Sequence, residues 1–278
     1  MPARGGTDVT ATVPAVRSLG VTVLDGIVAA HRAVAATDER DLDGLMAEAA
    51  AAPPARPFRA ALAAATGLAV IAEVKRRSPS AGLLAPDLDP GDLARRYESG
   101  GATAVSVLTD GEFFGGAPAD LLAAREACSL PVLRKDFTVS EADVCDARLM
   151  GADALLLIVA ALSDEELRRF RALAAGLGMD ALVEVHTEAE LDRALAAGAD
   201  LVGVNRRDLR TFELDPGLGE RLAARVPPGV VTVAESGVGG PADAAALGDA
   251  GYHAVLVGET LVRAPDPAAA VRALRGVP

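Results

Sequence analysis

The chain has no tryptophan, and Phe, Tyr and Trp together make up only 3% of its residues. Proteins that bind single-stranded nucleic acid usually stack bases on aromatic side chains, so this scarcity argues against that function. Net positive charge is missing as well, since the formal charge is −12 at pH 7. Such a chain has no general attraction for nucleic acid or for an anionic membrane surface. We therefore expect no nucleic-acid partner, and an anionic substrate would require a local cluster of positive charge.

Cysteine is nearly absent, and long apolar runs are missing altogether. The chain has two cysteines, Cys128 and Cys145, at no metal-binding spacing, and we expect both inside helices as reduced packing residues. No run of about 18 apolar residues occurs. Residues 1–20 lack the basic segment and apolar core of a signal peptide. We therefore expect a cytoplasmic protein with no membrane partner, in which residues 1–20 are a disordered tail.

Eight short apolar runs, rich in valine, leucine and isoleucine, recur along the chain. Because each run is hydrophobic throughout, it is typical of a strand covered on both faces in a parallel sheet. The runs are Leu68–Val74, Thr103–Leu108, Pro131–Arg134, Ala154–Val159, Ala181–Val185, Leu201–Val204, Val230–Ala234 and Ala254–Val257. Helical patterns separate them, including Pro90–Ser99, Asp120–Ala127, Ser163–Ala175, Glu188–Ala197 and Pro241–Ala250. This alternation predicts an α/β fold.

The number of strand–helix units favours a closed barrel over an open sheet. A doubly wound sheet more often has about five to seven strands and carries a glycine-rich turn after the first strand, which this chain lacks. We therefore predict a single (β/α)₈ TIM barrel over residues 68–278. Residues 21–67 contain two helical segments, Val23–Ala35 and Asp41–Ala51, and a Pro-Pro break. We expect this N-terminal helical extension to cap the barrel and to help cover a substrate pocket.

Polar residues follow several of the apolar runs at the point where each strand ends. Loops at the carboxyl ends of barrel strands surround one cleft, so these residues are expected to meet there. A charged group beside a core is costly unless it is paired or functional, and a structural ion pair would explain only one such case. The residues are Glu73, Lys75, Lys135, Glu184, Asn205 and Glu235. Their convergence predicts a catalytic site.

Lysine is scarce, since only two of the 27 basic residues, Lys75 and Lys135, are lysines. Both lie at predicted strand ends. Arginine stays protonated, whereas a lysine ammonium near other cations can have its pKa lowered and exchange a proton. That property suits a general acid or a Schiff-base amine. We therefore predict that both lysines are catalytic and that they form a cationic pair in one cleft.

Small residues follow the last two predicted strands. Ser236 and Gly237 come after the seventh, and Gly258 and Glu259 after the eighth, where barrels commonly bind phosphate. A helix expected after Gly258 would direct its N-terminal amides into the same space. These four residues are therefore predicted to bind a phosphate group.

The three histidines and one aromatic pair complete the candidates. His31 is expected on the surface of the N-terminal helix, and His253 at the opposite, amino-terminal end of the barrel. His186 is expected near the cleft but has no histidine or cysteine at metal-ligand spacing, so we predict no metal. Phe113 and Phe114 follow the second strand and are expected to form a hydrophobic wall for a ring-bearing substrate, with loop packing as the alternative.

Together these segments resemble the indole-3-glycerol phosphate synthase family of tryptophan biosynthesis. The resemblance covers residues 21–270 in order, and its most specific motif is Glu-Val-Lys-Arg-Arg-Ser-Pro-Ser at residues 73–80. Further matching segments are residues 106–116, 133–137, 182–186, 204–212 and 234–238. The resemblance implies a carboxy-lyase that converts 1-(2-carboxyphenylamino)-1-deoxyribulose 5-phosphate into indole-3-glycerol phosphate, with loss of carbon dioxide and water and without metal or organic cofactor.

The resemblance also implies a role for each matched residue. Lys135 would be the general acid that activates the ketose carbonyl, and Lys75 would hold the substrate carboxylate or phosphate. Glu184 would be the acid and base of the dehydration. The residues that would orient and polarise these groups are Glu73, Asn205 and Glu235. Ser78 and Arg207 would reach the anthranilate end, and Ser236, Gly237, Gly258 and Glu259 would present backbone amides to the phosphate. Phe113 stays a predicted substrate-binding residue through the aromatic loop, and Ser236 is predicted to bind substrate as well.

The expected ligand is thus a phosphorylated small molecule. The chain would be a monomer or a weak homodimer, with association with other tryptophan-pathway enzymes as a further prospect. Four alternatives stay open. A paralogue in secondary metabolism would carry identical motifs, whereas a related phosphate-binding barrel isomerase would need a cysteine or aspartate at the end of the first strand. A lysine Schiff-base aldolase is the third, and a non-catalytic barrel, which the polar strand ends argue against, is the fourth.

Overall fold

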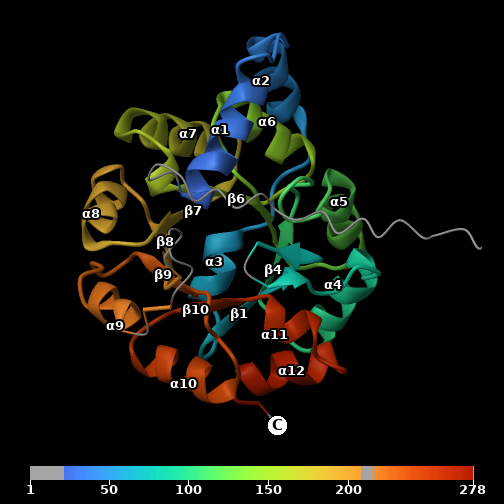
Figure 1. The fold of residues 1–278 in the computed structure, drawn as a ribbon, viewed down its shortest axis with the longest axis vertical. Helices are drawn as coiled ribbons and strands as arrows, with labels where there is room; N and C mark the ends of the chain where they lie inside the picture. The colour runs from blue at the N-terminus through green and yellow to red at the C-terminus, as the bar shows by residue number, and fades with distance from the viewer. Residues whose placement is uncertain (1–21, 80, 208–213, 216, 278) are drawn as a thin grey trace, which may run out of the picture.

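Residues 22–79, 81–207, 214–215 and 217–277 are described in the computed structural model. Eight parallel strands close into a barrel in the order β1-β10-β9-β8-β7-β6-β5-β4, and a ring of helices surrounds them (Figure 1). The strands are β1 (Ala69–Val74), β4 (Ala104–Leu108), β5 (Val132–Lys135), β6 (Ala154–Ile158), β7 (Asp180–Val185), β8 (Leu201–Asn205), β9 (Val231–Glu235) and β10 (Ala254–Val257). The predicted (β/α)₈ TIM barrel is confirmed, and each strand lies at one of the apolar runs.

The five helices predicted between the strands lie close to their expected positions, and further helices accompany them. They are α4 (Pro90–Ser99), α5 (Pro118–Ala127), α6 (Glu141–Leu149), α7 (Asp164–Gly176), α8 (Glu188–Ala196), α9 (Leu218–Ala223), α10 (Pro241–Asp249), α11 (Glu259–Val262) and α12 (Pro267–Leu274), with a 3₁₀ turn at Val159–Ala161 before α7. A small antiparallel ribbon, β2 (Arg77–Ser78) and β3 (Gly82–Leu83), follows β1 at the carboxyl end of the barrel. Residues 73–79 of the motif therefore lie beside the ends of the strands.

The segment before β1 reaches both ends of the barrel. Helices α1 (Val23–Ala35) and α2 (Leu42–Ala51) match the two predicted helical segments and project at the top of Figure 1. A third helix, α3 (Phe58–Ala63), was not predicted. Phe58 and Leu62 of α3 are buried against the first residues of several strands and so close the amino-terminal end of the barrel. The expected tail over residues 1–20 lies outside the described residues.

The buried residues form two layers, as the alternation of side chains along each strand requires. The inner layer fills the barrel with Ile71, Leu133 and Leu182. The outer layer joins the strands to the helices through residues such as Val105 and Phe170. With both faces of every strand covered, only the strand ends are free to present polar groups to a ligand.

The two cysteines are buried and free. Cys145 lies within α6 as expected, but Cys128 directly follows α5 and bonds back to the Ala124 carbonyl, so its predicted place inside a helix is wrong. None of the helices in the described part of the chain is long and apolar enough to cross a membrane.

Asp153, directly before β6, stabilises the amino-terminal end of the barrel. It is 0% exposed and accepts hydrogen bonds from Arg125 Nη1 at 2.5 Å, the Val132 amide at 2.8 Å and the Arg56 amide at 2.6 Å. Asp153→Ala leaves these donors and the Arg125 charge without their partner. We expect the free energy of unfolding, measured by denaturant titration, to fall by about 3–5 kcal/mol.

The matched control is Asp192→Ala. The Asp192 side chain is 61% exposed and pairs with Arg225 at 2.8 Å, and an exposed pair of this kind contributes less than about 1 kcal/mol. Equal losses in the two variants would contradict the role given to Asp153.

Candidate active site

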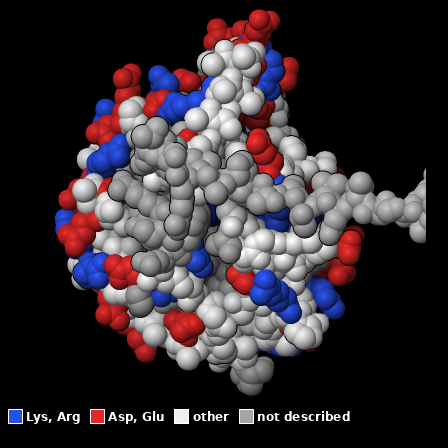
Figure 2. Space-filling view, viewed as in Figure 1, with Lys and Arg blue, Asp and Glu red and all other residues white. Residues whose placement is uncertain are grey.

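A cavity of about 650 Å³ opens at the carboxyl ends of the strands, and α1 forms part of its wall. All the predicted site residues except Phe113 line it. The residues placed together are Glu73, Lys75, Ser78, Lys135, Glu184, Asn205, Arg207, Glu235, Ser236, Gly237, Gly258 and Glu259. On the described part of the face in Figure 2, acidic and basic side chains are interspersed around the periphery. Lys75 and Lys135 line the cavity, and they contribute the local positive charge that an anionic substrate requires.

Lys135, the last residue of β5, lies between two buried carboxyl groups. Its Nζ is 3.3 Å from Glu184 Oε2 and 3.3 Å from Glu235 Oε2. The two glutamates come from β7 and β9, and their side chains are almost fully buried. Gly203 of β8 lies between them, and a Cβ at this position would lie 2.1 Å from Glu235 Oε1. The glycine therefore leaves the space that this cluster occupies, a role that the sequence did not suggest.

The charges in this cluster determine which of Lys135, Glu184 and Glu235 holds a proton. Burial opposes the charge of Lys135, but the carboxylates of Glu235, Glu184 and Glu73 outweigh it and raise the Lys135 pKa. Burial also acts against the charge of Glu184, yet Lys135 and His186 hold the Glu184 pKa well below its usual range. Burial, together with the Glu184 charge, raises the pKa of Glu235 to about 8. Near neutral pH the cluster thus contains an ammonium, an ionised Glu184 and a protonated Glu235.

The expectation that neighbouring cations make lysine exchange its proton is therefore wrong for Lys135. Its neighbours are carboxyl groups from other strands, and they favour the charged form. A substrate carbonyl oxygen would have to enter the cluster before the ammonium gives up a proton. The same charge argues against a Schiff-base role, which needs a free amine.

Lys75 and Glu73 form a second ion pair, at 2.7 Å between Nζ and Oε1. Their side chains share one face of β1, as the two-residue period of a strand predicts. Ser106 Oγ of β4 donates to Glu73 Oε2 at 3.4 Å. A Cβ at Gly258 would lie 2.5 Å from Glu73 Oε1 and 2.9 Å from Lys75 Nζ. Gly258 therefore makes room for this pair, besides contributing its backbone to the cavity wall.

Asn205, at the end of β8, connects the carboxylate cluster to the next loop. Its Nδ2 donates to Glu184 Oε1 at 3.3 Å, while its Oδ1 accepts bonds from Ser236 Oγ at 2.7 Å and the Arg207 amide at 3.1 Å. Ser236 has a φ of 63°, which is unusual for a residue other than glycine and is found where surrounding bonds enforce it. Asn205 thus orients Glu184 and fixes the loop after β9 at the same time.

His186 lies directly beside the lysine–carboxylate cluster, as its place near the cleft predicted. Nε2 is 3.3 Å from Glu184 Oε1, close enough for charge attraction though not aligned as a hydrogen bond, and Nδ1 is 3.2 Å from Glu190 Oε2. Burial disfavours its charge, but Glu184 and Glu190 raise the His186 pKa to about 10. His186 is therefore a second cation that keeps Glu184 ionised. This role could not be predicted from the sequence, because it depends on the folded position of His186 between Glu184 and Glu190.

The aromatic wall differs from the predicted one. Among the described residues, Phe114 and Phe137 line the cavity and Phe113 does not. The two rings lie 6.2 Å apart between centroids. The Phe113 amide donates to Asp110 Oδ1 at 2.6 Å, which makes Phe113 part of the loop's own structure. The assignment of Phe113 to the wall is therefore corrected to its neighbour Phe114, joined by Phe137.

The end of the cavity expected to take phosphate is built from the loops after β9 and β10. Ser236 and Gly237 form its first side, and both have positive φ angles, 63° and 70°. Glu259 begins α11, and its carboxylate pairs with Arg263 at 3.0 Å. Arg263 also lines the cavity and was not among the predicted residues. The Arg263 guanidinium compensates the negative charge of Glu259 at the end of the cavity where the phosphate is expected.

Two of the histidines lie outside the lysine–carboxylate cluster. His253 contacts Thr232 at the amino-terminal end of the barrel, with 2.9 Å between Nδ1 and Oγ1, as expected. His31 is not on an open surface as predicted. Its Nε2 lies 3.0 Å from Asp110 Oδ2, and its side chain is only 22% exposed.

Comparison with known proteins agrees with this geometry. The model of the family described as indole-3-glycerol phosphate synthase matches residues 24–274. A protein named indole-3-glycerol phosphate synthase 2 from Streptomyces coelicolor is 59% identical over 228 residues, 82% of this chain and 88% of the relative. The indole-3-glycerol phosphate synthase of Mycobacterium ulcerans is 53% identical over 252 residues, 90% of this chain and 92% of the relative.

Among solved structures, a thiamine phosphate pyrophosphorylase from Pyrococcus furiosus shares the fold, with a TM-score of 0.59 and 17% identity over 79% of this chain and 96% of that one. At this identity the likeness concerns the fold alone. The family match spans residues 24–274, and each of the two relatives matches most of the chain, so the chain belongs to the indole-3-glycerol phosphate synthase family.

Proposed function

We propose that this chain converts 1-(2-carboxyphenylamino)-1-deoxyribulose 5-phosphate into indole-3-glycerol phosphate, using Lys135, Glu184 and Glu235 as its proton-transfer groups. The observation that carries the proposal is the burial of Lys135 Nζ at 3.3 Å from two carboxyl groups, whose surroundings shift the pKa of Glu184 down and that of Glu235 up. Groups whose environments push their pKa values apart are what paired acid and base steps require. Family membership makes the chain a lyase of tryptophan biosynthesis.

The first step is ring closure. The aromatic carbon that bears the carboxylate bonds to the ketose carbon, and the carbonyl oxygen takes a proton from Lys135 Nζ. The bond to the carboxylate then breaks, carbon dioxide leaves, and its electron pair restores the aromatic ring. The surrounding carboxylates keep Lys135 protonated. Its ammonium group supplies the proton and stabilises the developing oxyanion.

The second step is loss of water. We assign proton donation to the departing hydroxyl to Glu235, which holds a proton near neutral pH, and removal of a proton from the neighbouring ring carbon to the ionised Glu184. Glu184 can return this proton to Lys135 at 3.3 Å. Glu235 regains its own from solvent, so each turnover consumes one proton. Asn205 and His186 orient Glu184 for this transfer.

The remaining groups hold the substrate at its two ends. Lys75 is assigned to the substrate carboxylate or phosphate, with Glu73 setting its position. Ser78 and Arg207 line the side assigned to the anthranilate group, together with Phe114. The phosphate is assigned to the side lined by residues that follow β9 and β10, namely Ser236, Gly237, Gly258, Glu259 and Arg263.

The direct test supplies the purified chain with the carboxyphenylamino substrate. We expect fluorescence of indole-3-glycerol phosphate to appear together with one equivalent of carbon dioxide. Consumption of the substrate without carbon dioxide would point to an isomerase. No reaction at all would contradict the proposal.

The protonation of Glu235 predicts a pH dependence. Its pKa in the folded chain is raised to about 8, so the donor is present below that pH and is lost as pH rises through it. We therefore expect kcat to fall as pH rises through about 8 in steady-state assays of the wild type, because Glu235 acts after carbon dioxide has left and so does not affect kcat/KM. In Glu235→Gln, turnover should be low and this part of the profile should disappear. A profile that keeps the same fall in Glu235→Gln would assign it to another group.

A further inference from the structure

His31 of α1 occupies a position that the proposed chemistry leaves unexplained. Helix α1 contributes Val23, Leu24 and Ile27 to the cavity wall, and His31 lies one turn beyond Ile27. Its imidazole Nε2 is 3.0 Å from Asp110 Oδ2 in the loop after β4. The same ring contacts Phe137 after β5, with 5.3 Å between centroids. One side chain thus touches two different loops at the cavity mouth.

Each of these two contacts involves one residue of the aromatic wall, Phe114 through Asp110 and Phe137 directly. Asp110 Oδ1 accepts hydrogen bonds from the Phe113 amide at 2.6 Å and from the Phe114 amide at 2.9 Å. Asp110 therefore fixes the backbone that carries Phe114, and its second oxygen is held by His31. Phe137 lines the same cavity as Phe114, so His31 contacts this half of the wall directly.

We propose that His31 is a positioning residue that sets the aromatic wall, by holding Phe114 through Asp110 and Phe137 by direct ring contact. Its effect is on binding of the substrate's aromatic ring rather than on proton transfer. The inference rests on the proposed function, because it takes the ring-bearing substrate as the ligand of that wall.

The charges around His31 favour its protonated form. The bond with Asp110 raises the His31 pKa, burial opposes this, and Asp136 and Asp143 add to the rise. Arg134 lies on the far side of Asp136, at 3.0 Å from its Oδ2, and Arg32 of α1 is paired with Glu166 of α7. The imidazolium contact is present below the raised pKa and is lost as pH rises through it.

A metal ion is the competing explanation, since ligand atoms of His31, Asp110 and Asp136 lie within 4.8 Å of one another. The oxygens of Asp136 already have donors, however. Thr109 Oγ1 and Arg134 Nη2 donate to Oδ2, and the Phe137 amide donates to Oδ1 at 2.8 Å. A guanidinium bonded to a carboxylate opposes a second cation there, so the contacts favour imidazolium over metal.

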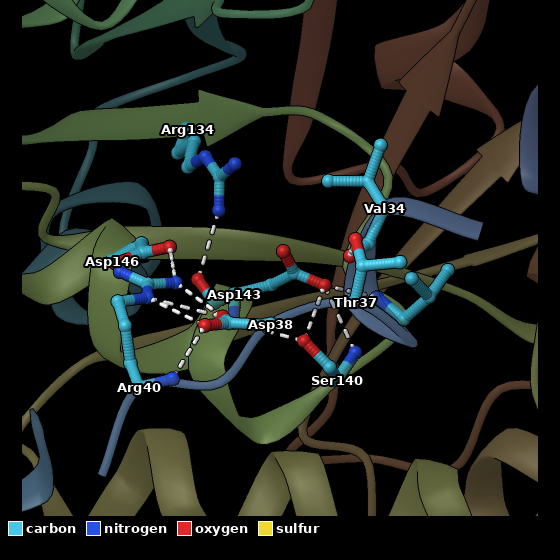
Figure 3. A network of polar contacts seen from close by, with 9 residues as sticks. Val34, Thr37, Asp38, Arg40, Arg134, Ser140, Asp143 and Asp146 are labelled. Carbon is cyan, nitrogen blue, oxygen red and sulfur yellow. Dashed lines mark hydrogen bonds and ion pairs between the residues drawn. The ribbon is translucent and has the colours of Figure 1, made fainter. Parts of the chain in front are cut away.

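The helix itself is held by other contacts, which lets the role of His31 be tested without loss of the fold. Arg32 Nη1 donates to Glu166 Oε1 at 2.9 Å. Figure 3 shows a second tie, in which Arg40, beyond the end of α1, lies between Asp38 and Asp146. In the same figure Ser140, at the start of α6, donates from its Oγ to the Asp143 side chain. The backbone carbonyl of Asp143 accepts a hydrogen bond from Arg134 Nη1 at 2.8 Å.

The test compares His31→Gln with Arg32→Gln, a neighbour that fastens α1 but does not touch the wall. In His31→Gln we expect KM to rise about tenfold while kcat changes less than about twofold, because substrate binding rather than reaction is affected. Arg32→Gln should leave KM within about twofold of the wild type. His31→Lys, which keeps a cation facing Asp110, should recover most of the lost affinity.

The pH profile gives the second measurement. The wild-type KM should rise as pH increases above the ordinary histidine range, and this dependence should vanish in His31→Gln. An unchanged KM in His31→Gln, or an equal rise in Arg32→Gln, would overturn the proposal. Zn²⁺ that raises the melting temperature of the wild type but not of His31→Gln would overturn it in favour of a metal site. An inactive wild type would instead refute the proposed function.

Discussion

Replacing Lys135 with alanine is expected to lower kcat by about 10³-fold or more, because the reaction loses its proton donor and the charge that stabilises the ketose oxygen. The ammonium is the centre of the buried cluster, at 3.3 Å from each of Glu184 and Glu235. Its removal takes away the cation that lies between the two carboxyl groups and leaves Glu184 with His186 alone, so some loss of stability is expected as well. Stopped-flow fluorescence of the product measures the rate, and circular dichroism checks the fold.

Lys135→Arg is the informative partner of this variant. Arginine keeps the positive charge between the carboxylates and so preserves the cluster, but it does not give up a proton near neutral pH. The expected result is a folded chain whose turnover is nearly as low as that of Lys135→Ala. Turnover close to that of the wild type in either variant would remove Lys135 from the role of proton donor.

Glu184→Gln is expected to lower kcat by about 10²–10⁴-fold, the range typical for a lost acid or base. The amide can still accept from Asn205 Nδ2 but cannot take a proton from the ring carbon. The dehydration should therefore become rate-limiting, and the ring-closed hydroxyl intermediate should accumulate in quenched reactions analysed by mass spectrometry. Carbon dioxide would then be released faster than the indole product appears.

The matched control for this variant is Glu190→Gln. Glu190 holds His186 from the side away from Glu184, with 2.8 Å from the His186 amide to its Oε2. Its loss should reduce kcat by less than about tenfold, since the base itself remains. Equal losses in the two glutamine variants, or accumulation of uncyclised substrate in Glu184→Gln, would contradict the assignment of Glu184 to the dehydration.

The residues at the strand ends could be predicted because a parallel barrel brings the carboxyl ends of all its strands to the same side. Once Glu73, Lys135, Glu184 and Glu235 are placed at the ends of apolar runs, the fold brings them to one rim without knowledge of any contact. The loop residues were less predictable. Phe113 and Phe114 are adjacent and alike, and both amides donate to Asp110 Oδ1, so only the folded loop shows that Phe114 lines the cavity.

Features that depend on contacts between distant segments could not be predicted. The direction of the Lys135 pKa shift comes from carboxylates on β7 and β9, whereas the sequence alone suggested cationic neighbours. The spaces at Gly203 and Gly258 have meaning only once the glutamates beside them are placed. His31 belongs to a helix predicted correctly, but its partner is 79 residues away, so the sequence indicated a surface position.

The charge state of Lys135 among its carboxylates can be measured directly because the chain has only two lysines. Labelling them with ¹⁵N at Nζ yields two NMR signals, and the Lys75→Arg variant identifies that of Lys135. We predict that the Lys135 signal remains that of an ammonium above pH 10.5, the ordinary lysine pKa, as long as the protein stays folded. A Lys135 amine that titrates below this value would contradict the account.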